Sequence, residues 1–268
     1  MCIGCRERRA ADWELRIMHE AALYDSNCFV TLTYGRDKLP ANQSLCYADF
    51  QSFMRRLRWH FKGKEVRFFM CGEYGTENKR PHYHACLFNV AFGDEVPMGR
   101  SKSGFLFSDS ALLRDLWGHG HVSVQALVRE TAGYCSRYIM TKALGKDAKK
   151  LLEFCDSETG EVLHRSPEFC RMSLKPGIGA RWFDRFGRDL RSGDFVVSGG
   201  VQRRIPKYYD KLSERRDLAE FEDRKFGRVL KARALPVEEK SSERLAVQEK
   251  VHAARIANQT RSALYVQE

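Results

Sequence analysis

The sequence predicts an α+β protein, because segments with strand character and segments with helix character occur together in its 268 residues. Residues 44–62 place apolar side chains at helical spacing and basic side chains on the remaining surface. Residues 211–234 and 237–265 have high helix propensity, with a proline between them. Three short apolar runs bounded by turn residues have the character of β-strands: 28–34, 68–71 and 85–88.

The first segment is predicted to form a helix over residues 10–23, with apolar side chains recurring on one face. Cys2 and Cys5 precede it with the spacing of half a zinc site, and two ordinary thiols are the alternative. We expect three regions in the chain, namely an N-terminal helix with the Cys pair, a central domain and a charged helical C-terminal region: 1–25, 26–209 and 210–268.

Residues 67–88 have the pattern of a β-hairpin with a long loop. Side chains alternate between the two faces of a strand, so His82 and His84 share one face and Tyr83 points to the other. Glu73, at the end of the first strand, can face the His pair across the hairpin. Two imidazoles and a carboxylate form a site for a divalent ion that leaves positions open for a phosphate. The alternative is that the imidazoles simply form hydrogen bonds in a half-buried strand.

The next segments carry weaker signals. Residues 91–104 are expected to be a loop, and residues 110–117 a short helix. His119 and His121 lie between glycines where a turn enters a strand, and they form a weaker candidate for metal binding. Residues 155–180 are predicted to be irregular.

A predicted helix over residues 126–144 carries Tyr134, Tyr138 and Lys142 at i, i+4 and i+8, which places them along one face. Two phenols and an ammonium group so placed can address one point in turn. A Tyr stripe packed into the core, with the Lys reaching outward, is the alternative. Because a phenol titrates near 10, a nucleophilic tyrosine needs a base, a cation or an activated electrophile.

The charge balance favours an anionic partner, and nucleic acid first. Lys and Arg give a net charge of +11 and a pI near 9.3, although solubility alone can require such an excess. Residues 210–268 carry 13 basic and 11 acidic groups, so most of the excess lies before them. Nine cysteines without a framework, and no signal peptide, favour a reducing cytoplasm. No apolar run approaches the roughly 18 residues of a membrane span.

Several of these motifs, in this order, resemble the HUH (His-hydrophobe-His) rolling-circle replication initiators. Within that superfamily the sequence is similar to the initiators of small single-stranded DNA phages, the microviruses, and most of all to the gokushovirus group. The resemblance rests on a Cys-x2-Cys-Arg start and on five further stretches: Phe29–Tyr34, Gly72–Gly75, Arg80–His84, Tyr134-x3-Tyr138 with Lys142, and Ile205–Asp210.

The resemblance implies a central antiparallel sheet of about five strands with flanking helices, in the layout of RNA-recognition modules. It also implies a reaction in which a tyrosine attacks single-stranded origin DNA and forms a 5′-phosphotyrosine bond. The free 3′-OH then serves a host polymerase, and a second tyrosine helps to close the displaced strand into a circle. By this resemblance His82, His84 and Glu73 are metal ligands, Tyr134 and Tyr138 are alternating nucleophiles, and Lys142 assists them.

The implied cofactor is Mg²⁺ or Mn²⁺, and no nucleotide is needed because both steps are transesterifications. No Walker-type motif is present, so strand separation is expected from a host helicase or from supercoiling in the host bacterial cytoplasm. The sequence departs from its relatives at Arg137, where they commonly have Lys, and at Lys142, which is four residues after Tyr138 rather than three. Relatives also often carry further cysteines before the first pair.

Basic and aromatic side chains are the candidates for holding single-stranded DNA. The loop-rich, basic residues 165–207 are a candidate for origin specificity, and the C-terminal helices for a partner, a dimer or duplex DNA. A non-catalytic single-strand-binding module and a related transposase or relaxase are the competing functions. The candidate DNA contacts are Arg55, Arg56, Arg58, Trp59, Lys79, Arg80 and Arg137.

Overall fold

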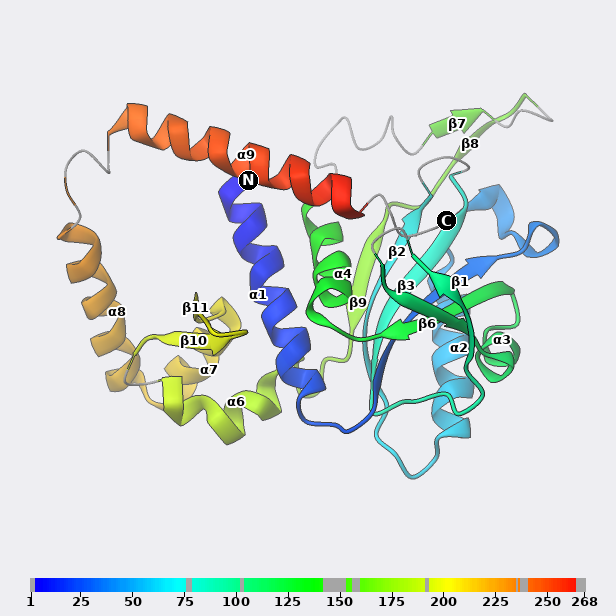
Figure 1. Cartoon of the computed structure of the whole chain (residues 1–268), viewed down its shortest axis with the longest axis horizontal. Coiled ribbons are helices and arrows are strands. Elements are labelled where there is room, and N and C mark those ends of the chain that lie inside the picture. The colour runs from blue at the N-terminus through cyan, green and yellow to red at the C-terminus, as the bar shows by residue number, and fades with distance from the viewer. Residues whose placement is uncertain are drawn as a thin grey trace.

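The computed structural model contains a large antiparallel sheet with helices on both faces, which confirms the predicted α+β class (Figure 1). Within the described part of the chain the sheet has seven strands, more than the five or so expected. No helix among the described residues is long and apolar enough to cross a bilayer. The structure describes residues 3–75, 79–101, 104–141, 153–155, 160–190, 193–234, 236 and 241–263.

The sheet is built around a central strand, β3, which pairs with β1 on one side and β2 on the other. The strand order is β4-β5-β6-β1-β3-β2-β9, with every neighbouring pair antiparallel. The bounds are β1 Asn27–Tyr34, β2 Arg67–Tyr74, β3 Pro81–Phe88, β4 Val96–Arg100, β5 Leu106–Asp109, β6 Gly120–Ala126 and β9 Phe169–Met172.

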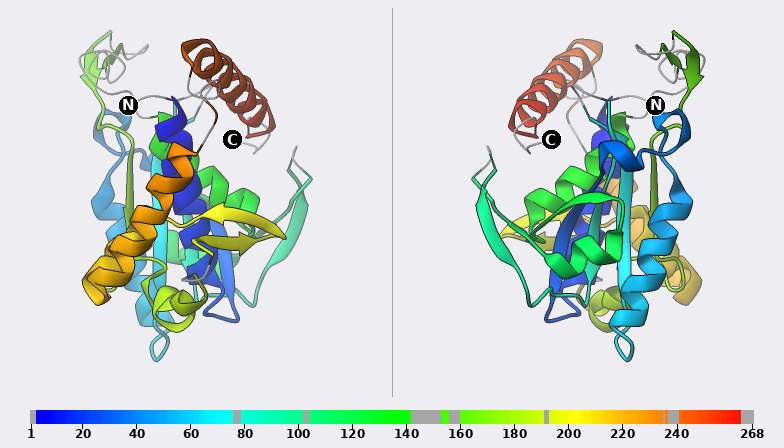
Figure 2. Two further views of the ribbon diagram at one scale, coloured as in Figure 1. Left: turned by 90° about the vertical axis from the view of Figure 1, so that its left-hand side faces the viewer. Right: turned by 90° about the vertical axis from the view of Figure 1, so that its right-hand side faces the viewer.

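Two strands arise where the sequence predicts none. β4 lies within the expected loop 91–104, and β9 within the expected irregular segment 155–180. β4 contains Pro97 and Gly99 and is exposed along most of its length, which a strand tolerates only at the edge of a sheet. Its tip with β5 projects from the body of the molecule (Figure 2). Pairing partners supplied by the fold, rather than local propensity, make both segments strands.

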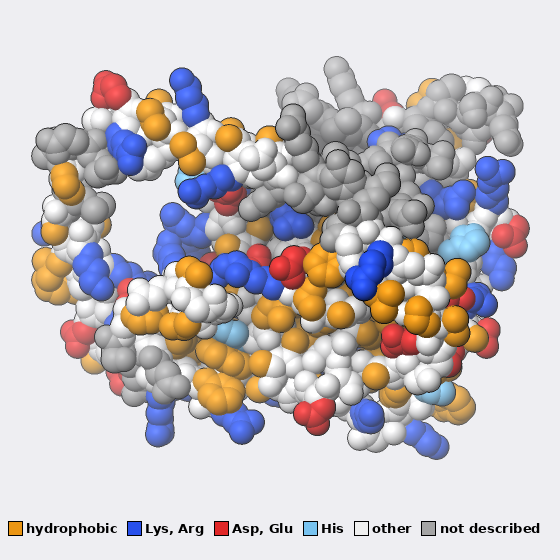
Figure 3. All heavy atoms as spheres, in the orientation of Figure 1, with side chains coloured by type: hydrophobic (Ala, Val, Ile, Leu, Met, Phe, Trp, Pro, Cys, Tyr) orange, Lys and Arg blue, Asp and Glu red, His pale blue; other side chains and the backbone are white. Residues whose placement is uncertain are grey.

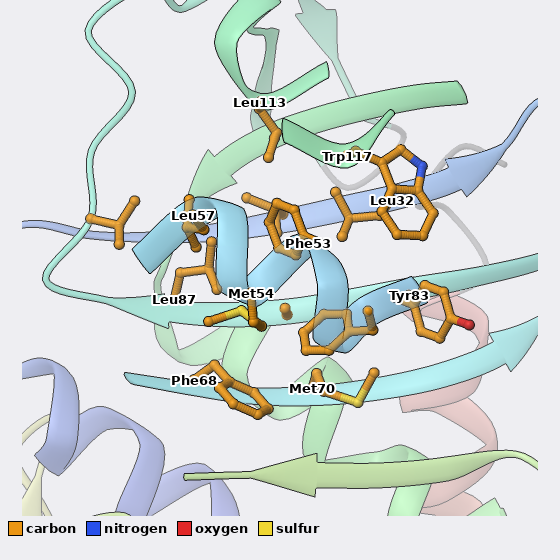
Figure 4. Close-up of a cluster of buried hydrophobic side chains, with 14 of the residues drawn as sticks. Leu32, Phe53, Met54, Leu57, Phe68, Met70, Tyr83, Leu87, Leu113 and Trp117 are labelled. Atoms are coloured by element: carbon orange, nitrogen blue, oxygen red, sulfur yellow. The ribbon is translucent and has the colours of Figure 1, made fainter. Parts of the chain in front are cut away.

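One face of the sheet is covered by α2 (Tyr47–His60) and α3 (Ala111–Trp117). Figure 4 shows side chains of both helices packed on the strands beneath them. Ser110 caps α3 by accepting a hydrogen bond from the Leu113 N–H. Tyr83 lies in this core, and its hydroxyl donates to the Cys46 carbonyl at 2.8 Å. The β3 side chain between the two histidines is therefore structural.

The opposite face is covered by α1 (Ile3–Ala21) and α4 (Arg129–Thr141), which pack against each other (Figure 1). Ile17 of α1 and Ala132 and Cys135 of α4 are fully buried there, against aromatic and thiol side chains of the strands. The alternation that buries Tyr83 on the first face directs His82 and His84 to this one. The two helices therefore determine what surrounds the His pair.

A third core lies on the other side of α1. Leu15 of α1 packs there with side chains from the segment between residues 180 and 212. The predicted helix 211–234 is divided at Asp217, whose carboxylate accepts the Glu220 N–H and caps the second part. The elements are α6 Ala180–Phe186, η3 Gly187–Leu190, β10 Phe195–Ser198, β11 Val201–Arg204, α7 Lys207–Arg216 and α8 Leu218–Arg233.

The remaining elements lie at the periphery. The expected helix 237–265 corresponds to α9 (Ser242–Ala263), which contacts α1 and forms an ion pair between His252 and Glu7. Lys and Arg side chains border the opening between α8, α9 and α1 (Figure 3). The others are two short turns after β1 and a separate two-stranded ribbon: η1 Arg36–Lys38, η2 Ala41–Gln43, β7 Glu153–Cys155 and β8 Val162–His164.

A buried ion pair joins α1 to the sheet. Arg67 Nε donates to Glu20 Oε1 at 2.6 Å, and Glu20 Oε2 accepts the Gly179 N–H at 2.7 Å. Arg67 Nη2 also donates to the Pro176 carbonyl at 2.6 Å. Both side chains are almost fully buried, so each charge depends on its partner.

We expect Glu20→Gln to lower the free energy of unfolding by about 3–5 kcal/mol, because it leaves the buried Arg67 charge uncompensated. Urea unfolding followed by circular dichroism measures the change. Glu222→Gln, which breaks an exposed pair with Lys225, is the matched control and should cost less than about 1 kcal/mol. Equal effects of the two substitutions would contradict the expectation.

The stability should also depend on His19. Its ring is buried, stacks on Trp182 at 3.5 Å between centroids, and has Nδ1 2.9 Å from the Tyr209 hydroxyl. Burial lowers the pKa of His19 to about 4. Between pH 6.5 and 4 the unfolded chain binds a proton that the folded chain does not, so stability is lost as the pH falls through this window.

The two pKa values imply a loss of about 3 kcal/mol over that window. We expect the stability difference between the wild type and His19→Asn to shrink by this amount as the pH is lowered from about 7 to about 4, since the variant lacks the titrating group. Urea unfolding at several pH values measures it. A difference that is independent of pH would show that His19 is protonated equally in both states.

Candidate active site

The β2–β3 hairpin brings three predicted ligands together. Glu73 pairs with His82 in register, and Cys71 pairs with His84, so the carboxylate faces both imidazoles as expected. Glu73 Oε1 lies 2.8 Å from His82 Nε2 and 2.6 Å from His84 Nε2. All three side chains are largely or fully buried beneath α4. Three donor atoms from two adjacent strands thus converge on one small region.

This group has the composition and spacing of a metal site. One donor atom from each of Glu73, His82 and His84 lies within 4.8 Å of the others. Neighbouring ligands that each bind a single ion at about 2.1 Å are about 3 Å apart. Of the described residues, no other set of three or more His, Cys, Asp or Glu donors is grouped this closely. The donor set therefore fits a divalent cation.

The electrostatics of Glu73 also fit a cation. Burial opposes ionisation of Glu73, but the two histidines outweigh it and hold the pKa of the carboxyl at about 2. Glu73 Oε2 is buried and has no hydrogen-bond partner, although Oε1 has several. Burial lowers the pKa of His84, which keeps that imidazole available as a neutral ligand. An ionised carboxylate with one unpaired buried oxygen is an arrangement that a cation stabilises.

α4 places Tyr134 at the same point. The Tyr134 hydroxyl donates to Glu73 Oε1 at 2.9 Å, and its ring lies edge-on to His84 with centroids 4.8 Å apart. Phe29 of β1 contacts both rings. Burial raises the pKa of Tyr134 well above its usual range, and the Glu73 charge raises it further. The phenol is therefore protonated in this arrangement.

The other two residues of the tyrosine motif are only partly described. The backbone of Tyr138 continues α4 one turn beyond Tyr134, as the i, i+4 spacing predicts, and its side chain lies outside the described residues. Lys142 also lies outside the described residues, next to the last residue of α4.

The predicted DNA contacts divide between the two faces of the sheet. Arg55, Arg56, Arg58 and Trp59 belong to α2, which covers the face opposite His82. Arg56 donates to the carbonyls at the end of α3, and Arg58 donates to the Val66 carbonyl, while Trp59 is 77% exposed. These four residues are not brought together with the candidate metal site. The amphipathic pattern of residues 44–62 shows that a helix packs on the sheet, but not on which face.

The other three predicted contacts lie on the elements that carry the site. Lys79 is exposed in the β2–β3 loop, and the Arg80 carbonyl accepts hydrogen bonds from the Gly75 N–H and His82 Nδ1. Arg137 lies on α4, where burial lowers its pKa and the charge of Glu14 opposes this. Their role in binding DNA stays a prediction.

Two further residues at the site escape the sequence reasoning. Glu168, just before β9, accepts the Tyr74 N–H at 3.1 Å, and burial, reinforced by the Glu73 charge, raises the pKa of this carboxyl. No local signal identifies it, because β9 itself is not predicted. Thr31 of β1 lies opposite His84 in register and contacts its ring nitrogen. The alternation of residues 29–33 placed Thr31 on one face, but the sequence did not show which strand would pair there.

The weaker metal candidates do not gather a ligand set. His119 and His121 lie at the start of β6, and no described group of donors includes them. Cys5 is an exposed free thiol in α1, and Cys2 lies outside the described residues. A zinc site at the Cys pair therefore stays a prediction.

Comparison with known proteins agrees with this arrangement. Residues 27–143, from β1 through α4, match the family model of the replication-associated protein ORF2. The chain is 32% identical to replication-associated protein VP4 of Bdellovibrio phage phiMH2K, over 78% of this chain and 64% of that protein. It is 31% identical to replication-associated protein ORF2 of Spiroplasma virus 4, over 82% of this chain and 68% of that protein. No solved structure matches.

The chain belongs to the family of phage replication-associated proteins. Replication-associated protein ORF4 of Chlamydia phage 1 is 26% identical over 79% of this chain. The chain spans 64% of the length of the Bdellovibrio phage relative and 52% of the Chlamydia phage relative. The resemblance noted from the motifs is thus confirmed, and the matches are consistent with a rolling-circle initiator of the microvirus type.

We expect Mn²⁺ to bind the wild-type protein and His82→Ala to weaken this binding by more than about 100-fold. Loss of a ligand should exceed the roughly 10–100-fold cost of losing an outer partner of a ligand. Titration calorimetry or Mn²⁺ paramagnetic resonance measures the affinity. His121→Ala is the matched control, because His121 belongs to no such donor group among the described residues. Similar weakening by both variants would contradict the site.

Proposed function

We propose that the protein is a replication initiator that cuts single-stranded viral origin DNA by tyrosine transesterification and later rejoins the displaced strand. The observation that carries this proposal is the hydrogen bond of 2.9 Å between the Tyr134 hydroxyl and Glu73 Oε1. It unites the candidate nucleophile with the candidate metal ligands, two motifs about fifty residues apart. Membership of the phage replication-associated family supports the same conclusion.

Tyr134 would attack the scissile phosphorus through its phenolic oxygen. The bond from this oxygen to phosphorus forms as the bond to the 3′ oxygen breaks, which leaves a 5′-phosphotyrosine and a free 3′-OH. The phenolic proton leaves along its hydrogen bond to Glu73 Oε1, and the leaving 3′ oxygen takes up a proton. Tyr138, one helical turn further on, is proposed to make the second attack, with Lys142 steadying the charge of phenolate or phosphate.

His82, His84 and Glu73 are the residues proposed to hold Mg²⁺ or Mn²⁺. The buried, unpaired Glu73 Oε2 supports this assignment. When bound there, a divalent ion would polarise the scissile phosphate and stabilise the charge that develops on it. Imidazole ligands favour Mn²⁺ and the carboxylate suits either ion, so the ligand set does not favour Mg²⁺ alone.

The net charge of +11 supports an anionic partner, and Lys79, Arg80 and Arg137 are the proposed contacts nearest to the site. We propose that residues 26–209 contain the nicking domain. The 3′-OH would serve a host DNA polymerase, while a host helicase would open the duplex in the host bacterial cytoplasm. The α2 residues Arg55, Arg56, Arg58 and Trp59 remain proposed contacts for a strand that follows the opposite face.

We expect a covalent adduct when the protein is incubated with Mn²⁺ and single-stranded oligonucleotides that tile the viral strand. A label at the 3′ end should migrate with the protein on a denaturing gel, because the protein holds the 5′ phosphate. A label at the 5′ end should appear on a free fragment. Chelation of the metal should prevent both events.

Tyr134→Phe and Tyr138→Phe should each leave partial cleavage if the two tyrosines alternate, and the double variant should form no adduct. Tyr47→Phe makes the same change on the opposite face of the sheet and should leave the adduct yield unchanged. An adduct formed by the double variant would sink the assignment of the nucleophiles. Binding without metal and without any covalent product would instead identify a non-catalytic single-strand-binding protein.

A further inference from the structure

Thr31 is a polar residue that faces the candidate metal site without belonging to the ligand set. It lies in the middle of β1, directly opposite His84 in the register with β3. Its hydroxyl oxygen is 2.9 Å from His84 Nδ1, while His84 Nε2 lies 2.6 Å from Glu73 Oε1. The two ring nitrogens of His84 therefore contact two different groups, one on each side of the ring.

The two histidines are oriented by different means. His82 Nδ1 donates to the Arg80 carbonyl at 3.0 Å, which can only accept. This contact places the proton of a neutral His82 on Nδ1 and leaves the Nε2 lone pair for an ion. His84 has a hydroxyl at the corresponding position, and a hydroxyl can both donate and accept.

We infer that Thr31 is a positioning residue that holds His84 with Nε2 directed at the metal site and accepts the Nδ1 proton in a hydrogen bond when an ion is bound. A neutral imidazole carries one proton, so the nitrogen that ligates an ion must leave its proton to the other. Metal-binding histidines generally donate that second N–H to an outer partner, which fixes the ring. This inference rests on the metal site of the proposed function.

Neighbouring contacts leave this role to the hydroxyl. Phe29 stacks on His84 with centroids 5.4 Å apart and an angle of 16° between the planes, so it supports the face of the ring. An aromatic face does not discriminate between the two ring nitrogens. The position of the proton on the His84 ring thus depends on Thr31 Oγ1 and Glu73 Oε1, which contact opposite sides of it.

Thr33 provides a matched control on the same strand. It lies two residues further along β1, on the same face, and pairs with His82 as Thr31 pairs with His84. His82 Nδ1, however, donates to the Arg80 carbonyl. Replacement of either threonine by valine keeps the β-branched shape and removes one hydroxyl.

We expect Thr31→Val to weaken Mn²⁺ binding by about 10–100-fold, as loss of an outer partner generally does. Thr31→Ser should restore affinity to within about threefold of the wild type, and Thr33→Val should leave it at that level. Mn²⁺ affinity is measured by titration calorimetry on the full chain. Nitrogen-15 shifts of the His84 ring in the Zn²⁺-loaded protein should show Nδ1 protonated in the wild type and in Thr31→Ser.

Equal affinity of Thr31→Val and the wild type would overturn the inference, as would equal losses in both valine variants. If Thr31→Val does not fold, Thr31→Ala compared with Thr31→Ser decides the same question. Failure of the wild type to bind Mn²⁺ would overturn the proposed metal site itself. Binding by the wild type with no effect at Thr31 would leave that site intact and remove only the role of Thr31.

Discussion

The buried carboxylate of Glu73 is the constraint on which the arrangement of the candidate site depends. An ionised group removed from water must be compensated by donors or by a cation. Here the compensation comes from His82, His84 and Tyr134, which approach the same oxygen from β3 and α4. The site therefore exists only when the β2–β3 hairpin is in register and α4 is packed over it. The carboxylate couples the sheet to the helix that carries the candidate nucleophile.

The sheet separates stability from chemistry by the alternation of its side chains. Tyr83 and its neighbours on one face join the large core under α2 and α3. The next residues along β3 face α1 and α4, where polar groups are retained among apolar ones. α1 holds α4 in place and is itself tied to the sheet by Glu20 and Arg67. Rigid elements thus support both the imidazoles and the phenol, and such support is needed to keep reacting groups in position.

Much of the site follows from local patterns, and the rest does not. The pairing of Glu73 with His82 was predictable because a hairpin with a defined loop fixes which residues face each other. The side of the sheet on which α2 packs was not, so its arginines were expected near DNA and are found on the opposite face. Glu168 was missed because its strand, β9, forms only through pairing with β2. Strand propensity depends on such neighbours more than helix propensity does.

The sequence by itself determined the class of the fold, the shared face of His82 and His84, and the helix with Tyr134 and Tyr138 one turn apart. These features follow from the periods of strands and helices, which act over a few residues. Only the tertiary structure decided that Tyr134 reaches Glu73, that Thr31 faces His84, and that α2 lies on the other side. Those relations join segments that are distant in sequence, and packing in three dimensions sets them because no short-range period extends that far.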